Sequence, residues 1–120
     1  PEKGISPVLK ALGYSVAGAR FLAKEEAARI EFYALVGALI LFLLLGASFL
    51  QVIGLLGLGL LVLMVEALNT SIELIVDRTS PERSDYAKHS KDLGSLAVFC
   101  SLMMMSLYVA VIIFHLIIPL

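Results

Sequence analysis

The feature that most constrains this chain is a run of 34 uncharged residues, 32–65, between Glu31 and Glu66. At a rise of about 1.5 Å per residue, one helix of that length is too long for an apolar membrane core of about 30 Å. The run therefore predicts two membrane-spanning helices joined by a tight turn. We expect that turn at GASFLQ, residues 46–51, within a few positions.

A third apolar segment follows from Leu93 onward, with His115 as its one histidine and no Asp, Glu, Lys or Arg. The chain is 60% hydrophobic and 16% charged, with a mean hydropathy of +0.98. Soluble domains are typically about 45–50% apolar and about 25% charged. We therefore predict an all-α integral membrane protein that forms a single domain over 1–120. Its expected parts are a surface helix at 1–29, membrane-spanning helices at about 30–47, 52–77 and 93–118, and a cytoplasmic loop at 78–92.

The basic residues predict the orientation. They precede the first span or lie between the second and third spans: Lys3, Lys10, Arg20, Lys24 and Arg29, then Arg78, Arg83, Lys88 and Lys91. Because loops rich in Lys and Arg stay inside, the N-terminus and the 78–92 loop are expected in the cytoplasm. The net charge of −1 says little, since the charge is unevenly distributed, and no nucleic-acid partner is expected.

The first 29 residues form a separate element. Apolar side chains recur there at roughly helical intervals, with Lys10, Arg20 and Lys24 between them. That pattern favours an amphipathic helix lying on the cytoplasmic surface of the membrane. The alternative is a short soluble helix packed on the loop. Cys100 is the single cysteine, which excludes an intramolecular disulfide and a cysteine-based metal site.

Polar residues follow one face of the second predicted span, at Glu66, Asn69, Thr70, Glu73 and Asp77. An ionisable group near the centre of a span costs about 2.5–3.5 kcal/mol on insertion scales. If Asp77 marks the headgroup level, Glu66 lies about 16 Å deeper along the helix. This face therefore indicates a function that offsets the cost.

Three interpretations compete. Asn69 and Thr70 alone favour a polar seam between helices. A buried Glu66 is also compatible with proton or ion translocation. The third interpretation is catalysis at the bilayer surface, in which Glu66 reaches the headgroup of an amphiphile and Glu73 holds a metal.

Further polar groups favour the third interpretation. Acidic side chains at Glu25, Glu26 and Glu31 precede the first span at the level of Glu73, and Mg²⁺ with a bound phosphate requires such carboxylates. The segment HSKDLGS supplies Lys91, Asp92 and Ser95 at the entry to the third span, and its cation and hydroxyl suit a nucleotide's phosphates. Neither GxxxxGK[ST] nor GxGxxG occurs in the sequence, so ATP would be held without a glycine-rich phosphate loop.

The sequence EALNTSIELIVDR, followed thirteen residues after its Arg by KDLGS, resembles the signature of the prokaryotic diacylglycerol kinase family. LKALGYSVAGAR and KEEAARIE resemble that family's surface-helix and first-span motifs, so the resemblance covers nearly the whole chain. It implies a homotrimeric lipid kinase of the bacterial inner membrane that phosphorylates diacylglycerol with ATP and Mg²⁺. VDR and KDLGS resemble this branch more than the sister branch, which phosphorylates undecaprenol.

The resemblance also implies roles for particular residues. Glu66 would be the general base toward the lipid hydroxyl, with Ser95 near the lipid and Asn69 orienting groups in the site. Glu73 would ligate Mg²⁺ together with Glu25 or Glu26. Glu25 and Glu26 both remain candidates for this ligand, because this chain reads EEAAR where the family usually has an EAAFR-like segment. The residues matching nucleotide-site positions are Tyr14, Glu25, Glu26, Glu73, Glu82, Arg83, Ser84, Lys91 and Asp92, of which Lys91 also counts as catalytic.

Overall fold

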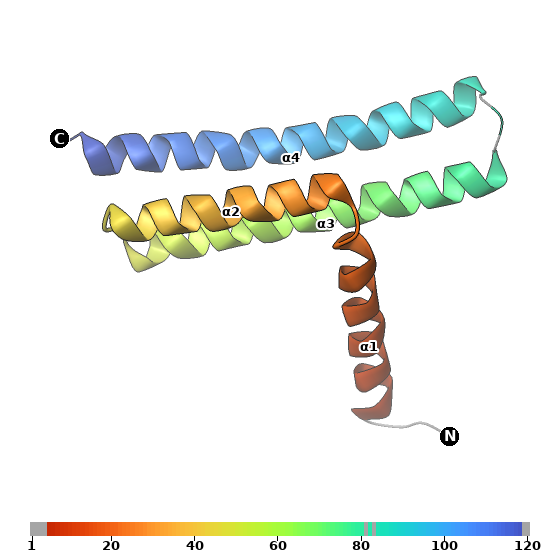
Figure 1. Ribbon diagram of the computed structural model, residues 1–120, viewed down its shortest axis with the longest axis horizontal. Helices are drawn as coiled ribbons and strands as arrows, with labels where there is room; N and C mark the ends of the chain where they lie inside the picture. The colour runs from red at the N-terminus through yellow and green to blue at the C-terminus, as the bar shows by residue number, and fades with distance from the viewer. Residues whose placement is uncertain (1–4, 81, 83, 119–120) are drawn as a thin grey trace.

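The computed structural model describes residues 5–80, 82 and 84–118. These residues form four α-helices: α1 (Ile5–Leu22), α2 (Glu26–Leu44), α3 (Phe49–Thr79) and α4 (Asp85–Ile117). Helices α2, α3 and α4 run side by side in alternating directions, and α1 projects away from them (Figure 1). The same three helices are long and apolar enough to cross a membrane. The prediction of an all-α protein with three membrane-spanning helices is thereby confirmed.

The turn between α2 and α3 occupies residues 45–48, at the start of the predicted 46–51 segment. Gly46 has a φ of +78°, a left-handed conformation that glycine adopts without strain. Ser48 then caps α3: its hydroxyl accepts from the Gln51 N–H at 3.2 Å, and its own N–H donates to Gln51 Oε1 at 2.8 Å. This reciprocal capping box begins the helix at Phe49.

The connection between α3 and α4 is shorter than the 78–92 loop that we predicted. Helix α3 continues to Thr79, and α4 begins at Asp85, where the Ser84 hydroxyl accepts a hydrogen bond from the Ala87 N–H at 3.1 Å. Charged residues in 85–92 thus form the first turns of α4. A helix can continue past the membrane boundary, because its backbone hydrogen bonds are internal.

The segment between α1 and α2 is held by Arg29. Its Nη1 donates to the carbonyl oxygens of Ala23 at 3.1 Å and Lys24 at 2.8 Å. These bonds join the first turn of α2 to the segment that follows α1. Of the two predicted metal ligands in this region, Glu25 immediately precedes α2 and Glu26 is the first residue of α2.

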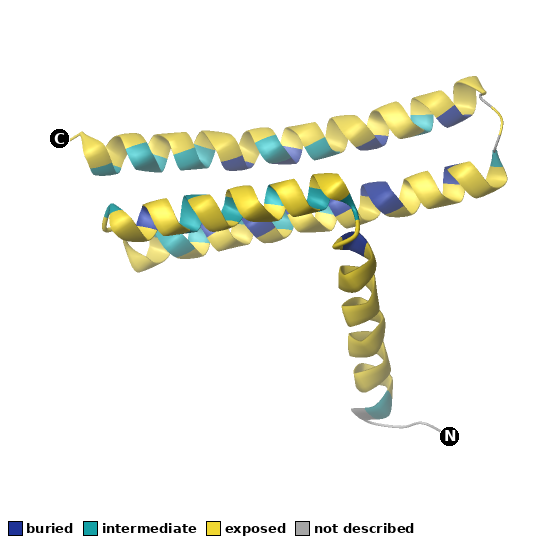
Figure 2. Cartoon of the chain, viewed as in Figure 1, coloured by how far each residue is buried: buried dark blue, intermediate teal, exposed yellow. Residues whose placement is uncertain are grey.

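Helix α3 is central, since it packs against both α2 and α4 and carries most of the buried positions (Figure 2). Phe42 and Leu55 are fully buried. Close helix approach uses glycine: a side chain at Gly59 would collide with Leu35, and one at Gly54 would collide with Tyr108. Small residues at such contacts are typical of membrane helix pairs. Many large apolar side chains point outward, as expected for helices surrounded by lipid.

Tyr108 makes a long-range side-chain hydrogen bond at the end of the bundle near the 45–48 turn. Its hydroxyl donates to the Gln51 carbonyl oxygen at 2.7 Å and links α4 to α3. We expect Tyr108→Phe to lower the melting temperature in detergent, because an interhelical hydrogen bond in a membrane protein contributes about 0.6 kcal/mol on average. Tyr33→Phe, at an exposed position of α2, is the control. Equal melting temperatures for wild type and Tyr108→Phe would contradict the assignment.

Candidate functional site

The polar face of α3 is buried at its deeper end. Glu66, Asn69 and Thr70 are 6%, 8% and 8% exposed, whereas Glu73 and Asp77 are exposed. The difference follows from packing, because α2 covers only part of the length of α3 (Figure 1). The face therefore runs from an enclosed carboxyl group to carboxylates that water can reach.

An apolar cavity of about 550 Å³ lies beside Glu66, between α2, α3 and α4. Among the described residues that line it, Glu31 and Glu66 are the ionisable ones; the remaining lining is Ala28, Ile30, Phe32, Ala34, Leu35, Leu56, Gly59, Leu60, Val62, Leu63, Leu102 and Met105. Glu66 Oε2 is buried and has no hydrogen-bond partner within 5–80, 82 and 84–118. A buried polar atom without a partner is costly, which indicates a site for a ligand's polar group.

Glu31 also belongs to this site, although its position in the sequence placed it only among the acidic residues before the first span. Its carboxyl lies beside that of Glu66, and both residues line the same cavity. Ionised carboxylates only accept hydrogen bonds, so a hydrogen bond between the two carboxyls requires a proton on one of them. A sequence signal for the pair existed: Glu31 and Glu66 flank the uncharged run, and an antiparallel hairpin brings the two ends of such a run to the same level.

Asn69 connects the deep and shallow parts of the polar face. Its Nδ2 donates to Glu73 Oε1 at 3.0 Å. Its Oδ1 is buried without a partner in the described part of the chain, directly against Gly94 of α4. A β-carbon at position 94 would collide with that oxygen, so the glycine in KDLGS makes room for Asn69.

A second, polar cavity of about 450 Å³ lies where α3 passes into α4. It brings together four of the predicted nucleotide-binding residues, Glu82, Ser84, Lys91 and Asp92. Its other lining residues are Asp77, Ser80, Asp85, Ala87 and Lys88. Arg83, also predicted here, lies outside the described residues.

Both lysines of this cavity are paired with carboxylates. Lys91 Nζ lies 2.5 Å from Asp77 Oδ1, and Lys88 Nζ lies 2.6 Å from Asp92 Oδ2. All four side chains are largely exposed, and exposed ion pairs contribute only about 0.2–1 kcal/mol. A multiply charged phosphate can therefore replace either carboxylate at small cost.

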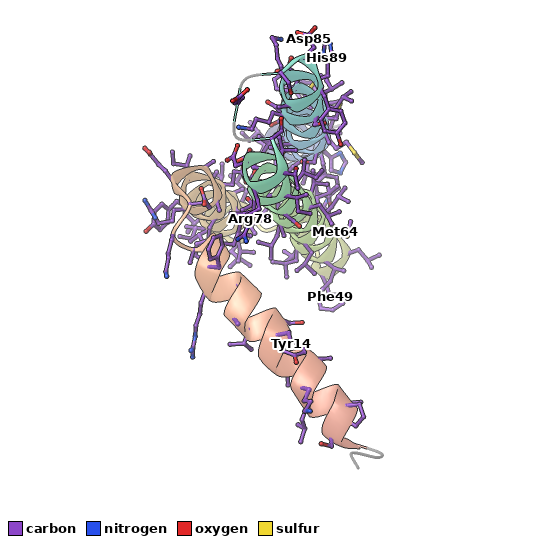
Figure 3. All side chains as sticks on the ribbon, turned by 90° about the vertical axis from the view of Figure 1, so that its right-hand side faces the viewer. Tyr14, Phe49, Met64, Arg78, Asp85 and His89 are labelled. Atoms are coloured by element: carbon purple, nitrogen blue, oxygen red, sulfur yellow. The ribbon has the colours of Figure 1, made fainter. Side chains whose placement is uncertain are left out.

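The other predicted site residues line neither cavity. Tyr14 is 75% exposed on α1, away from the start of α4, where Asp85 and His89 lie (Figure 3). Ser95 is exposed on α4, one residue beyond Gly94. The roles assigned to Tyr14 and Ser95 stay predictions.

The predicted metal ligands Glu25, Glu26 and Glu73 do not form a three-residue cluster. Across 5–80, 82 and 84–118, no group of three or more His, Cys, Asp or Glu side chains gathers in a geometry that could hold a metal. Mg²⁺, however, is commonly bound through one or two carboxylates together with substrate phosphates and water. The described residues do not form a closed metal cage, and carboxylates such as that of Glu73 are the ligand type that suits a metal arriving with a nucleotide.

The fold and these two cavities define a small multi-pass α-helical membrane protein, with a carboxyl pair in its apolar part and a charged cavity at one end of the same helices. The family model described as prokaryotic diacylglycerol kinase matches residues 13–114. The chain therefore belongs to the prokaryotic diacylglycerol kinase family.

Relatives named diacylglycerol kinase match along most of their length. One from Sinorhizobium sp is 42% identical over 112 residues, covering 93% of this chain and 82% of the relative. One from Pseudomonas aeruginosa is 39% identical over 102 residues, covering 84% and 83%. One from Escherichia coli K12 is 35% identical over 100 residues, covering 82% of each.

Proposed function

We propose that this protein transfers the γ-phosphate of ATP to diacylglycerol and forms phosphatidic acid at the cytoplasmic face of a bacterial inner membrane. The observation that carries this proposal is the buried Glu66 carboxyl: Glu66 lines an apolar cavity, and its Oε2 has no partner among the described residues. An uncharged lipid with a free hydroxyl matches such a cavity, because its chains suit the apolar walls and its hydroxyl suits the carboxyl. Family membership supports the same substrate.

In this mechanism Glu66 is the general base. Its carboxylate accepts the proton of the lipid hydroxyl, the lipid oxygen forms a bond to the γ-phosphorus, and the bond from that phosphorus to the β-bridging oxygen breaks. ADP leaves with the electron pair. Phosphoryl transfer of this kind depends on positioning and charge neutralisation more than on covalent help from the protein.

The polar cavity is the proposed nucleotide site. Lys91 and Lys88 neutralise phosphate charge there, Ser84 donates a hydrogen bond, and Glu82 and Asp92 complete the contacts. Tyr14 of α1 would approach the nucleotide from outside this cavity. Glu73 and either Glu25 or Glu26 would hold Mg²⁺, which supplies positive charge to the transferring phosphoryl group when bound. Asn69 orients Glu73 through the 3.0 Å hydrogen bond, and Ser95 contacts the lipid headgroup.

The proposal includes the arrangement in the membrane. Helix α1 lies on the cytoplasmic surface, with the N-terminus and the α3–α4 connection on the same side. Apolar side chains of α1 such as Leu9, Leu12 and Val16 are exposed, which suits contact with lipid. The protein assembles as a homotrimer, as the family resemblance implies.

A transfer assay in detergent micelles tests the activity. The protein receives Mg²⁺ and radiolabelled ATP, with diacylglycerol and undecaprenol offered side by side. We expect label on diacylglycerol. Label on undecaprenol alone would assign the sister activity, and label on neither lipid would contradict a lipid kinase.

Glu73→Gln tests the metal assignment. We expect the Mg²⁺ dependence of transfer to shift to about tenfold higher Mg²⁺, equivalent to about 1.4 kcal/mol, because the amide offers a weaker ligand than a carboxylate. The measurement is initial rate against Mg²⁺ concentration at constant ATP. Ser71→Ala, at an exposed position of the same helix outside both cavities, is the control. An unchanged curve for Glu73→Gln, or equal shifts in both variants, would contradict the assignment.

A further inference from the structure

The contact between Glu31 and Glu66 is held by the packing of α2 on α3. Leu35, one turn from Glu31, packs on Gly59, two turns from Glu66, and a side chain at position 59 would collide with it. This close approach sets the register between the two helices. As a result, Glu31 of α2 lies beside the enclosed Glu66 of α3, in the lining of the same apolar cavity.

Among the described residues that line the cavity, none carries a positive charge that would offset two ionised carboxylates. Around the cavity, α2 and α3 contribute Glu31 and Glu66 as titratable groups, and α4 contributes Leu102 and Met105. Helix α1 does not line the cavity within its described residues. On α2 the nearest cation in sequence, Arg29, donates to the backbone carbonyls of Ala23 and Lys24 instead. A shared proton is therefore what allows the two carboxyls to lie together.

We propose that Glu31 is a positioning residue for the general base: its protonated carboxyl donates a hydrogen bond to the Glu66 carboxylate and leaves Glu66 Oε2 free for the lipid hydroxyl. This inference rests on the proposed kinase function. The unpartnered Oε2 supports it, because the other carboxylate oxygen is the one available to Glu31.

The proton balance keeps the roles of the two carboxyls distinct. The lipid O–H bond breaks and its proton moves to Glu66 Oε2, while the lipid oxygen bonds to the γ-phosphorus and ADP leaves. The proton on Glu31 stays on Glu31 throughout. Glu66 then releases its proton to water at the cytoplasmic side before the next turnover.

Substituting Glu31 with a neutral amide tests whether Glu31 acts as a hydrogen-bond donor or through its charge. Glu31→Gln keeps a hydrogen-bond donor that does not titrate, so we expect kcat close to wild type and a smaller loss of activity toward alkaline pH. Glu31→Ala removes the donor, and we expect kcat to fall about tenfold or more, with an unchanged KM for MgATP. In wild type, ionisation of Glu31 at high pH removes the donor and adds a like charge beside Glu66.

The experiment measures kcat and KM of wild type, Glu31→Gln, Glu31→Ala and the control Tyr33→Phe from slightly acid to alkaline pH, with diacylglycerol and MgATP in micelles. Tyr33→Phe changes an exposed α2 residue outside the cavity and should match wild type. Wild-type kcat in Glu31→Ala, or equal losses and identical pH profiles in both Glu31 variants, would overturn the proposal.

Infrared spectroscopy separates this proposal from the proposed function. The C=O stretch of a protonated carboxylic acid should be present in wild type at neutral pH and absent in Glu31→Gln. If wild type shows this band but labels no diacylglycerol, the kinase proposal fails and the protonated pair stands. If wild type labels diacylglycerol but shows no difference in the band, the positioning proposal fails.

Discussion

Glu66→Gln lowers the rate of phosphate transfer to diacylglycerol by about 10²–10⁴-fold, the range by which a positioned general base typically accelerates a reaction. The amide keeps the size and the buried position of the side chain but cannot accept the lipid proton at a useful strength. The loss is expected in kcat, since the nucleotide cavity does not include Glu66. Initial rates with radiolabelled ATP measure it.

The same substitution should leave the melting temperature unchanged or raise it. A carboxyl group inside a membrane span destabilises the folded protein, and an amide reduces that cost. Loss of activity without loss of stability separates a catalytic role from a structural one. Ser71→Ala, at an exposed position of the same helix, is the control and should keep the wild-type rate. Full transfer by Glu66→Gln would end the assignment of Glu66 as base.

The membrane-spanning hairpin was predictable because it depends on charge alone. An uncharged run that is too long for one helix must turn back, and the run between Glu31 and Glu66 does so. The position of the turn was less accurate because hydropathy is continuous through it. The Ser48 and Gln51 capping pair, three residues apart, was the local signal that locates the start of α3.

The candidate site was predictable where its residues share one helix and less so where helices meet. The spacing of Glu66, Asn69 and Glu73 places them on one face of α3, and the structure adds the hydrogen bond between Asn69 and Glu73. The ion pair between Asp77 and Lys91 depends instead on the short 80–84 connection, which returns α4 beside α3. Because we predicted a loop over 78–92, we did not expect Lys91 to lie beside Asp77.

The direction of α1 was the least predictable part of the site. Composition indicates a surface helix but does not say at what angle it leaves α2, and that angle decides how close Tyr14 comes to the nucleotide cavity. Arg29 holds the connecting segment through backbone carbonyls. Such a contact depends on the folded path of the backbone, so it cannot be predicted from the spacing of residue types in the sequence.

Gly94→Ala should reduce transfer by about 10²-fold, a loss typical of misplacing a catalytic group by about 1 Å. The new β-carbon would collide with Asn69 Oδ1, so the Asn69 amide must move and its hydrogen bond to Glu73 is lost. Because the colliding atom ends a flexible side chain, the helices need not separate, and the melting temperature should change little. Gly57→Ala is the matched control on α3, since a β-carbon there meets no atom within 4 Å.

A double-mutant cycle shows whether Gly94 acts through Asn69. Asn69→Ala removes the side chain that the new β-carbon would strike, so adding Gly94→Ala to that variant should cause little further loss. Transfer rates of the two single variants and the double variant, each measured at saturating MgATP, supply the comparison. If the separate losses multiply in the double variant, Gly94 acts independently of Asn69. The missing β-carbon at position 94 would then serve helix packing instead of making room for the amide that orients Glu73.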